Sequence, residues 1–112
     1  MTDRFDIQLL EKAAQFLASM DPKAREKVLF NMRKAQVTND AELLKKLTEH
    51  IWEFRTQYAG LQYRFLAFWV KRSGQRALII ATHGFSKKTQ KTPSRELDHA
   101  LQMRNRYLKD HG

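Results

Sequence analysis

The hydrophobic pattern of this 112-residue chain changes its period near residue 51, and this change constrains the fold more than any other feature. Before that point, apolar residues recur every three to four positions, as on one face of an amphipathic helix. After it, they alternate with polar residues or form short runs rich in branched and aromatic residues, which is typical of strands. Helices followed by strands predict an α+β fold, and the length predicts a single domain over residues 1–112.

Helices are predicted in the first half of the chain. One apolar stripe extends from Leu9 to Met20, and Asp21-Pro22 then supplies an N-cap and a proline at the first position of a second helix. Asn39 and Glu42 have the spacing of a capping box and predict a short third helix. The inward residues expected in the second and third helices are Val28, Leu29, Met32, Ala35, Leu43, Leu44 and Leu47. Residues 5–9 fit either a strand or the beginning of the first helix.

Three strands and a final helix are predicted in the second half. The strands cover residues 51–56, 61–70 and 77–81, and their short turns predict an antiparallel meander, one face of which the N-terminal helices cover. Residues 82–93 are polar, basic and without periodicity, which predicts a loop. Thr92 and Pro93 are then expected to begin a C-terminal helix. Its expected inner stripe consists of Leu97, Ala100, Leu101 and Leu108, with Arg104 among them.

The positive charge is concentrated in the second half of the chain. The formal net charge is +9, and residues 1–49 contain nine Lys and Arg against eight Asp and Glu, whereas residues 50–112 contain twelve against four. A basic excess indicates a polyanionic partner such as nucleic acid. A nucleic-acid-binding surface is therefore expected on the strands and the segments that follow them. The alternative, a basic surface that only serves solubility, predicts a more even distribution.

Several kinds of chemistry find no support in the composition. The chain has no cysteine, its four histidines are scattered, and none of its serines lies in a nucleophile-elbow motif. There is no glycine-rich phosphate loop, so neither a metal nor a small-molecule cofactor is expected. The longest apolar run, at residues 65–70, is too short to span a membrane, and the N-terminus has no signal-peptide pattern. The expectation is a cytoplasmic protein without membrane contact.

A cluster of cationic residues is predicted on the sheet. If the chain turns at residues 58–60, then Arg55 and Arg64 lie near each other across the hairpin. Lys87, Lys88 and Lys91 leave the end of the next strand. Two arginines and a lysine-rich loop on one rim form a surface suited to phosphate. The alternative is a structural ion pair of the arginines with Glu53.

The order of these elements and three local motifs resemble the phage-derived, HigB-like branch of the RelE/ParE toxin superfamily. The motifs are Trp52-Glu53-Phe54-Arg55, Tyr63-Arg64 and the run from His83 to Pro93, HGFSKKTQKTP, which is the most specific of the three. The resemblance extends over essentially the whole chain. It implies a RelE-like fold in which residues 5–8 form a strand that joins the meander to give about four strands.

The resemblance also implies a function. Such toxins belong to type II toxin–antitoxin modules and cut mRNA at the ribosome without a metal, and the ribose 2′-OH is the nucleophile. The cognate antitoxin is expected to be a small helix-turn-helix protein. Arg64 is expected to bind the scissile phosphate, Arg55 to assist, and Lys87 or Lys88 to complete the cationic clamp. His83 is the preferred proton carrier, with Glu53 and, on the C-terminal helix, Tyr107 as other candidates. Phe85, Lys88, Lys91 and Arg104 are expected to contact RNA.

Two other functions remain open at this stage. ParE-type relatives share the fold and inhibit gyrase without cutting RNA, in which case the loop with Lys87 to Lys91 and the C-terminal helix would bind protein. An inactive domain that only binds nucleic acid is the other alternative. The position of the arginine pair on the sheet favours RNA cleavage.

Overall fold

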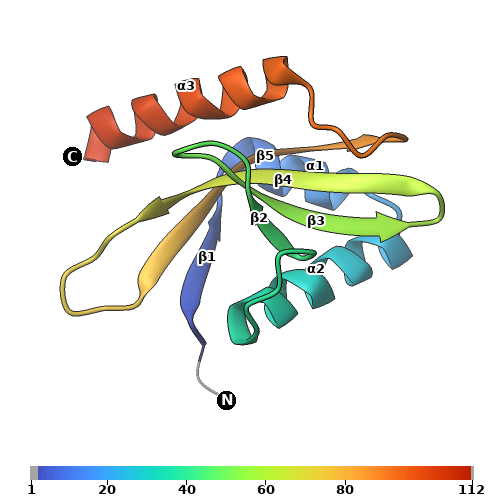
Figure 1. Ribbon diagram of the computed structural model, residues 1–112, viewed down its shortest axis with the longest axis horizontal. Helices are drawn as coiled ribbons and strands as arrows, with labels where there is room; N and C mark the ends of the chain where they lie inside the picture. The colour runs from blue at the N-terminus through green and yellow to red at the C-terminus, as the bar shows by residue number, and fades with distance from the viewer. Residues whose placement is uncertain (1–2, 112) are drawn as a thin grey trace.

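The computed structural model describes residues 3–111 and has an α+β fold with five strands and three helices (Figure 1). The elements follow one another as β1 (Phe5–Leu9), α1 (Glu11–Ser19), α2 (Pro22–Val37), β2 (Leu44–Lys46), β3 (Trp52–Tyr58), β4 (Leu61–Val70), β5 (Ala77–Lys87) and α3 (Ser94–His111). The fold class predicted from the sequence is confirmed. None of the helices within residues 3–111 is long and apolar enough to cross a membrane.

The five strands form one mixed sheet in the order β1-β5-β4-β3-β2. Strands β3, β4 and β5 make the predicted antiparallel meander. The strand that the resemblance implies at the N-terminus is present as β1, but it pairs in parallel with β5, and Phe5 lies opposite Ala77. The expectation of an antiparallel sheet of about four strands is therefore corrected to a mixed sheet of five.

The predicted third helix is absent, and β2 takes its place. Asp40 begins a single turn: its carboxylate accepts a hydrogen bond from the amide of Glu42, and its carbonyl accepts from Leu43 and Leu44. The chain then extends, and Leu44 pairs with Phe54 of β3. The prediction of a helix was wrong because three leucines after a capping residue are compatible with a single turn as well as with a helix. Pairing with a strand ten residues later then determines the rest.

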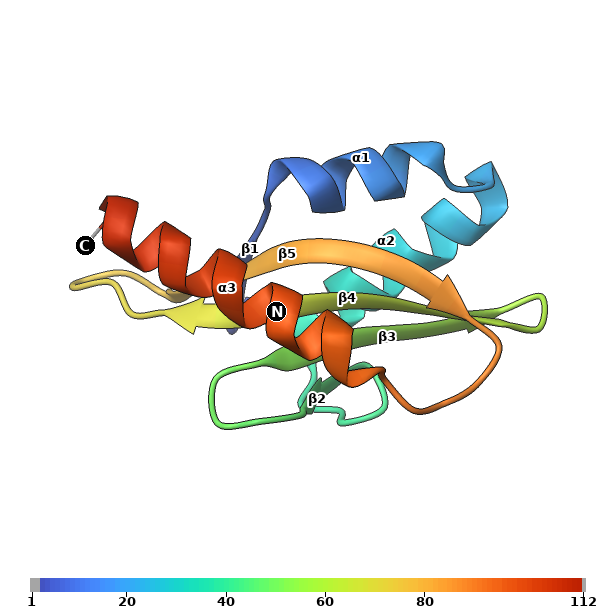
Figure 2. The same ribbon diagram turned by 90° about the horizontal axis from the view of Figure 1, so that it is seen from above.

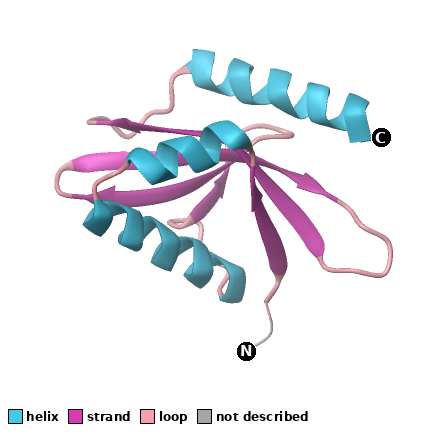
Figure 3. Cartoon of the chain, turned by 180° about the vertical axis from the view of Figure 1, so that it is seen from behind, coloured by secondary structure: helices cyan, strands magenta, loops and turns pink. Residues whose placement is uncertain are grey.

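Helices α1 and α2 cover one face of the sheet, as predicted (Figure 3). They bury Ala13 and Leu17 from α1 and Ala24, Val28, Met32 and Ala35 from α2 against Phe54, Phe65 and Ile79 of the sheet. Leu29 was expected to face inward, but 48% of its surface is exposed. The buried positions of α2 follow a spacing of four, four and three residues, so the buried face passes through Ala24 and leaves Leu29 outside.

Helix α3 lies over the opposite face, where Ala100 packs with Ile51, Leu66, Phe68 and Ile80 (Figure 2). The predicted inner stripe is only partly correct. Leu97 and Ala100 face the sheet, but Leu101 and Leu108 are each 37% exposed. Tyr107 takes the inner position instead, and its ring stacks edge-on to Phe68 with centroids 5.5 Å apart.

Strand β5 is longer than predicted and includes the first half of the expected loop. It continues through His83 and Phe85 to Lys87, where the polar composition had indicated a loop. Pairing with the long strand β4 explains the difference, because Gln62, Arg64 and Leu66 provide partners for Lys87, Phe85 and His83. The true loop covers only residues 88–93.

Candidate functional site

Arg55 and Arg64 lie directly opposite each other on β3 and β4. The two strands are joined by a two-residue turn in which Ala59 and Gly60 both have a positive φ, of 52° and 79°. Such a turn fits the twist of an antiparallel hairpin and fixes its register. The short-range proximity predicted for the two arginines is therefore confirmed.

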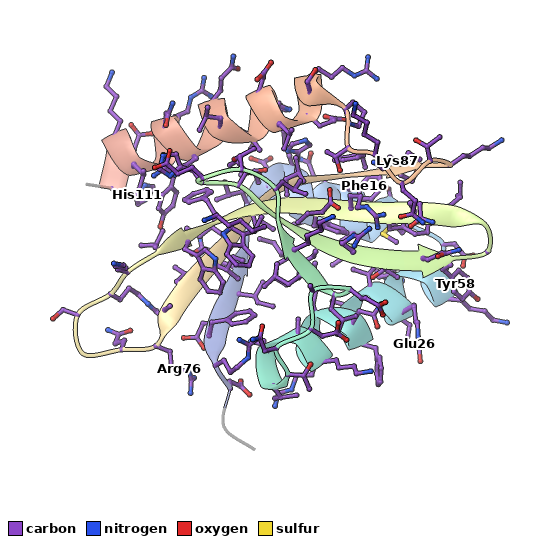
Figure 4. The ribbon with its side chains drawn as sticks, in the orientation of Figure 1. Phe16, Glu26, Tyr58, Arg76, Lys87 and His111 are labelled. Carbon is purple, nitrogen blue, oxygen red and sulfur yellow. The ribbon has the colours of Figure 1, made fainter. Side chains whose placement is uncertain are left out.

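A β-bulge at Thr82 brings β5 residues to the same face. Leu66 pairs with His83 and Ala67 pairs with Ala81, so Thr82 is an extra residue on β5. Because side chains alternate along a strand, one extra residue moves every later side chain to the other face. His83, Phe85 and Lys87 therefore share the face of Arg64 and of α3. Figure 4 labels Lys87 at the end of the sheet near Tyr58, far from Arg76 at the other end.

Glu53 lies between the two arginines. Its Oε1 atom is 3.1 Å from Nε of Arg64 and 3.4 Å from Nε of Arg55, and its other oxygen accepts a hydrogen bond from the hydroxyl of Thr92. The side chains of Glu53 and Arg64 are only 2% and 1% exposed. The structural ion pair considered as an alternative is thus present, and it belongs to the same site as the cationic cluster.

The loop after β5 closes over this group. The side-chain oxygen of Gln90 accepts hydrogen bonds from Arg64, at 3.1 Å, and from Arg55, at 3.3 Å. The backbone carbonyl of Gln90 accepts a bond of 2.9 Å from Nζ of Lys87. Three cationic side chains from three strands therefore converge on one exposed residue of the loop.

The site has more hydrogen-bond donors than acceptors. The Nε groups of Arg55 and Arg64 are buried and have no partner in hydrogen-bond geometry among residues 3–111. Both nitrogens lie within ion-pair distance of Glu53, but their N–H bonds do not point at its oxygen, so the contact is electrostatic only. One carboxylate against Arg55, Arg64 and Lys87 leaves the site electropositive.

Burial changes the electrostatics of two of these groups. It lowers the pKa of the Arg64 guanidinium, and Glu53 opposes this effect. Burial also lowers the pKa of Lys87; Glu53 opposes that change, and Arg64 and Arg55 reinforce it. Lys87 is therefore a better proton donor than an ordinary surface lysine.

Two adjoining clefts open next to the cationic cluster. The first cleft has a volume of about 320 Å³, and its lining includes Arg55, Arg64, Gln62, Gln90 and Leu43. The second, of about 230 Å³, is lined by Glu53, Arg55, Lys91 and Thr92 and by Lys45 from β2. Arg55 and Gln90 line both clefts, so an extended ligand that crossed the cluster would meet Arg55 from either side.

His83 lies in a second, separate group beneath α3. Its Nδ1 atom is 2.9 Å from the hydroxyl oxygen of Thr82, and its Nε2 atom is 3.2 Å from a carboxylate oxygen of Glu96. The ring lies against that of His99, with centroids 4.6 Å apart and the two ring planes tilted by 41°. Burial lowers the pKa of His83, and the neighbouring carboxylate of Glu96 opposes this change. The structure thus does not bring His83 into contact with Glu53, Arg55 or Arg64.

The residues predicted to contact RNA occupy different surroundings. Lys88 and Lys91 are exposed on the loop. Phe85 is half-buried, packs against the α3 side of the core and lies 6.0 Å from Nζ of Lys87. Arg104 is half-buried on α3, where its one side-chain hydrogen bond within residues 3–111 goes to Asn105. Of these four, the two lysines lie on the same loop as Gln90.

Four residues of these two groups were missed from the sequence. Gln90 was treated only as a loop residue, and Thr92 as the N-cap of the C-terminal helix, which in the structure begins at Ser94. No local pattern links Thr92 to Glu53, 39 positions earlier. Glu96 and His99 join His83, and here a signal existed. A Glu-x-x-His spacing puts both side chains on one face of a helix.

Comparison with known proteins identifies one family. Residues 15–105 match the family described as "Phage derived protein Gp49-like (DUF891)". No curated protein matches the chain. The matched region begins in α1 and extends into α3, so it includes both arginines, Glu53, the loop after β5 and the group around His83. Since this match covers most of the sequence, the chain belongs to the phage-derived Gp49-like family.

Proposed function

We propose that this protein is the toxin of a toxin–antitoxin module and that it cleaves mRNA at the ribosome without using a metal ion. Membership of the Gp49-like family is consistent with a toxin of such a module. The cleavage part of the proposal rests on the environment of Arg64. Its side chain is almost fully buried and lines a cleft, its Nη2 donates to the exposed Gln90 at 3.1 Å, and it lies opposite Arg55 across the hairpin. Guanidinium groups bind phosphate oxygens with two parallel hydrogen bonds.

The proposed reaction is an internal phosphoryl transfer. The ribose 2′-oxygen attacks the adjacent phosphorus and forms a new O–P bond, while the bond from phosphorus to the 5′-oxygen of the next nucleotide breaks. A base accepts the proton of the 2′-OH, and an acid gives one to the departing 5′-oxygen. The products are a 2′,3′-cyclic phosphate and a 5′-hydroxyl. Extra negative charge develops on the non-bridging oxygens, and fixed cations stabilise it.

Each side chain of the cationic cluster has a part in this reaction. Arg64 and Arg55 bind the non-bridging oxygens, and Lys87, whose pKa is lowered by burial, donates the proton to the 5′-oxygen. Glu53 orients the two guanidinium groups and is the nearest candidate base. His83 stays a prediction as a proton carrier, because its ring lies under α3 and would reach the phosphate only after that helix moved. Lys88 and Lys91 extend the basic surface along the RNA.

A mapping of RNA 5′-ends in cells tests the proposal. The wild-type chain is induced without its antitoxin, which we expect to be a helix-turn-helix protein, and transcripts are sequenced minutes later. New 5′-hydroxyl ends in phase with codons are expected. Arg64→Ala should abolish both the new ends and growth arrest, whereas Lys71→Ala, in the turn at the far end of the sheet, should retain them. Arrest without new ends would replace RNA cleavage by inhibition of gyrase, and unchanged ends in Arg64→Ala would remove Arg64 from the mechanism.

A further inference from the structure

We propose that His83, Glu96 and His99 form a binding site for a divalent cation of the zinc class, which ties α3 to β5. A single ligand atom from each residue lies within 4.8 Å of the ligand atoms of the other two. This site is separate from the Arg55–Arg64 cluster. A cation bound there would occupy a ring nitrogen of His83, so RNA cleavage would then use Lys87 and Glu53, and not His83, for proton transfer.

The positions of the three side chains follow from the fold. Glu96 and His99 are three residues apart in the first half of α3, so both point from the same face of the helix. His83 reaches them because the bulge at Thr82 turns its ring toward α3. Two imidazoles and one carboxylate are a ligand set that zinc uses, with the fourth position left to water.

The hydrogen bonds around His83 leave one ring nitrogen suited to ligation. The Thr82 hydroxyl lies 3.2 Å from the carbonyl oxygen of Leu66 and donates its hydrogen there. The hydroxyl oxygen then accepts a hydrogen bond from Nδ1–H of His83, which leaves a lone pair on Nε2. Histidines that bind metals are oriented in this manner by a partner at the other ring nitrogen.

The distance between His83 and Glu96 also fits a shared cation. The lone pair of Nε2 faces Oε1 of Glu96 at 3.2 Å, so two electron-pair donors point at each other. A cation bound between them would replace this unfavourable contact by one metal–nitrogen and one metal–oxygen bond. In a tetrahedral zinc site with ligand bonds of about 2.0–2.1 Å, neighbouring ligand atoms are roughly 3.3 Å apart. The pair therefore already has the separation that zinc requires.

One ring nitrogen of His99 faces a cationic side chain. Nζ of Lys12, on α1, lies 3.4 Å from Nε2 of His99. An ammonium group can only donate, so this nitrogen of His99 presents a lone pair. Lys12 is exposed, and its side chain can turn toward solvent when a cation of higher charge arrives.

The consequence of binding would be a firmer attachment of α3. Within residues 94–111, Ala100 is the one residue of this helix that is fully buried. A cation shared by β5 and the first turns of α3 adds a link where the hydrophobic contact is small. The helix follows directly on the loop that carries Gln90 and Thr92, so the same link would limit the motion of that loop.

Metal titration of the purified full-length chain tests the site. After treatment with a chelator, the protein is titrated with Co²⁺ by visible absorption and with Zn²⁺ by calorimetry. One equivalent should bind, with the intense absorption of tetrahedral Co²⁺. His99→Ala and Glu96→Gln should each weaken binding by at least about ten-fold. His50→Ala removes an exposed histidine that is not one of the three proposed ligands and should bind like the wild type.

Folding and attachment of α3 are measured in parallel. Circular dichroism should show the same metal-free spectrum for the wild type and His99→Ala, because His99 lies on the partly exposed side of the helix. Zinc should slow hydrogen exchange of the amides of α3 in the wild type and leave exchange in His99→Ala unchanged. Absence of one-equivalent binding, or equal affinity in the wild type and His99→Ala, would overturn the proposal.

Discussion

The carboxylate of Glu53 lies 3.1 Å from Nε of Arg64, and both side chains are withdrawn from solvent at the centre of the sheet. Arg55 and Thr92 make the remaining contacts of this carboxylate. The Glu53–Arg64 ion pair therefore forms the buried centre of the cationic cluster. A charged guanidinium can stay buried here because a negative charge is fixed beside it.

Replacing Glu53 by Gln should destabilise the protein. Gln keeps the shape and a hydrogen-bond acceptor but removes the charge, which leaves the buried Arg64 without a counter-ion. Breaking a buried ion pair in this way costs about 3–5 kcal/mol. We expect the lower part of that range, because Gln can still accept the hydrogen bond from Thr92. Urea unfolding at neutral pH measures the change. In the double variant Glu53→Gln with Arg64→Met, much of the loss should be recovered; an unchanged loss would show that the charge of Arg64 is not its cause.

Replacing Gln90 by Ala should increase the affinity of the site for phosphate. The Gln90 oxygen accepts from Arg55 and Arg64, so it occupies a position that a phosphate oxygen needs. In the variant, phosphate no longer has to displace the Gln90 side chain from the arginines. Displacing about one hydrogen bond costs about 1 kcal/mol, so the affinity should increase roughly five-fold. Calorimetry with a nucleoside 2′,3′-cyclic phosphate measures this change, with Gln75→Ala as the control. Weaker binding by the variant would mean that Gln90 holds the arginines in place rather than competing with the ligand.

Replacing Gly84 by Ala should destabilise the packing of α1 on the sheet. A Cβ atom at this position would lie 2.6 Å from a ring carbon of Phe16 and 2.8 Å from one of Phe65. Overpacking of this kind costs about 1–3 kcal/mol. Thermal unfolding followed by circular dichroism should show the lower stability. Adding Phe16→Leu should restore part of it, because the half-buried ring of Phe16 is the closest obstacle; a double variant no more stable than Gly84→Ala would contradict this explanation.

Stability should decrease in acid because of Asp6. The hydrogen bond from Arg72 holds the pKa of Asp6 below its usual value, and Arg76 adds to this effect. A carboxyl group with a lowered pKa stabilises the folded state at pH values above its unfolded pKa of about 4, and this contribution is lost as pH falls through the folded value. Urea midpoints of the wild type and Asp6→Asn should therefore differ at pH 6 and converge below pH 4. A constant difference across this range would exclude Asp6 as its source.

Local signals in the sequence were sufficient for much of the fold and for half of the site. The turn at residues 58–60 fixes the β3–β4 hairpin by itself, so the pairing of Arg55 with Arg64 could be predicted. The second half of the site depends on contacts between distant residues. Thr92 meets Glu53 only because the loop after β5 crosses β3 and β4, and no pattern of residues near either one indicates it.

The errors have a common physical cause. At residues 43–47 and 82–87, local composition favoured one structure, and pairing with a neighbouring strand imposed another. The bulge at Thr82 is the clearest case. In a strictly alternating strand, the side chains of His83 and Lys87 would point toward α1. The unpaired residue Thr82 moves both side chains to the face covered by α3.

The parallel pairing of β1 with β5 also determines when this sheet can be completed. Phe5 is synthesised 72 residues before its partner Ala77. Until then β1 has no neighbour on either side, because β5 is the only strand it pairs with in the described sheet. Contacts between such distant residues slow folding. Lys87 and the Gln90 loop come later still, so a nascent chain has no assembled cationic cluster until both have been synthesised.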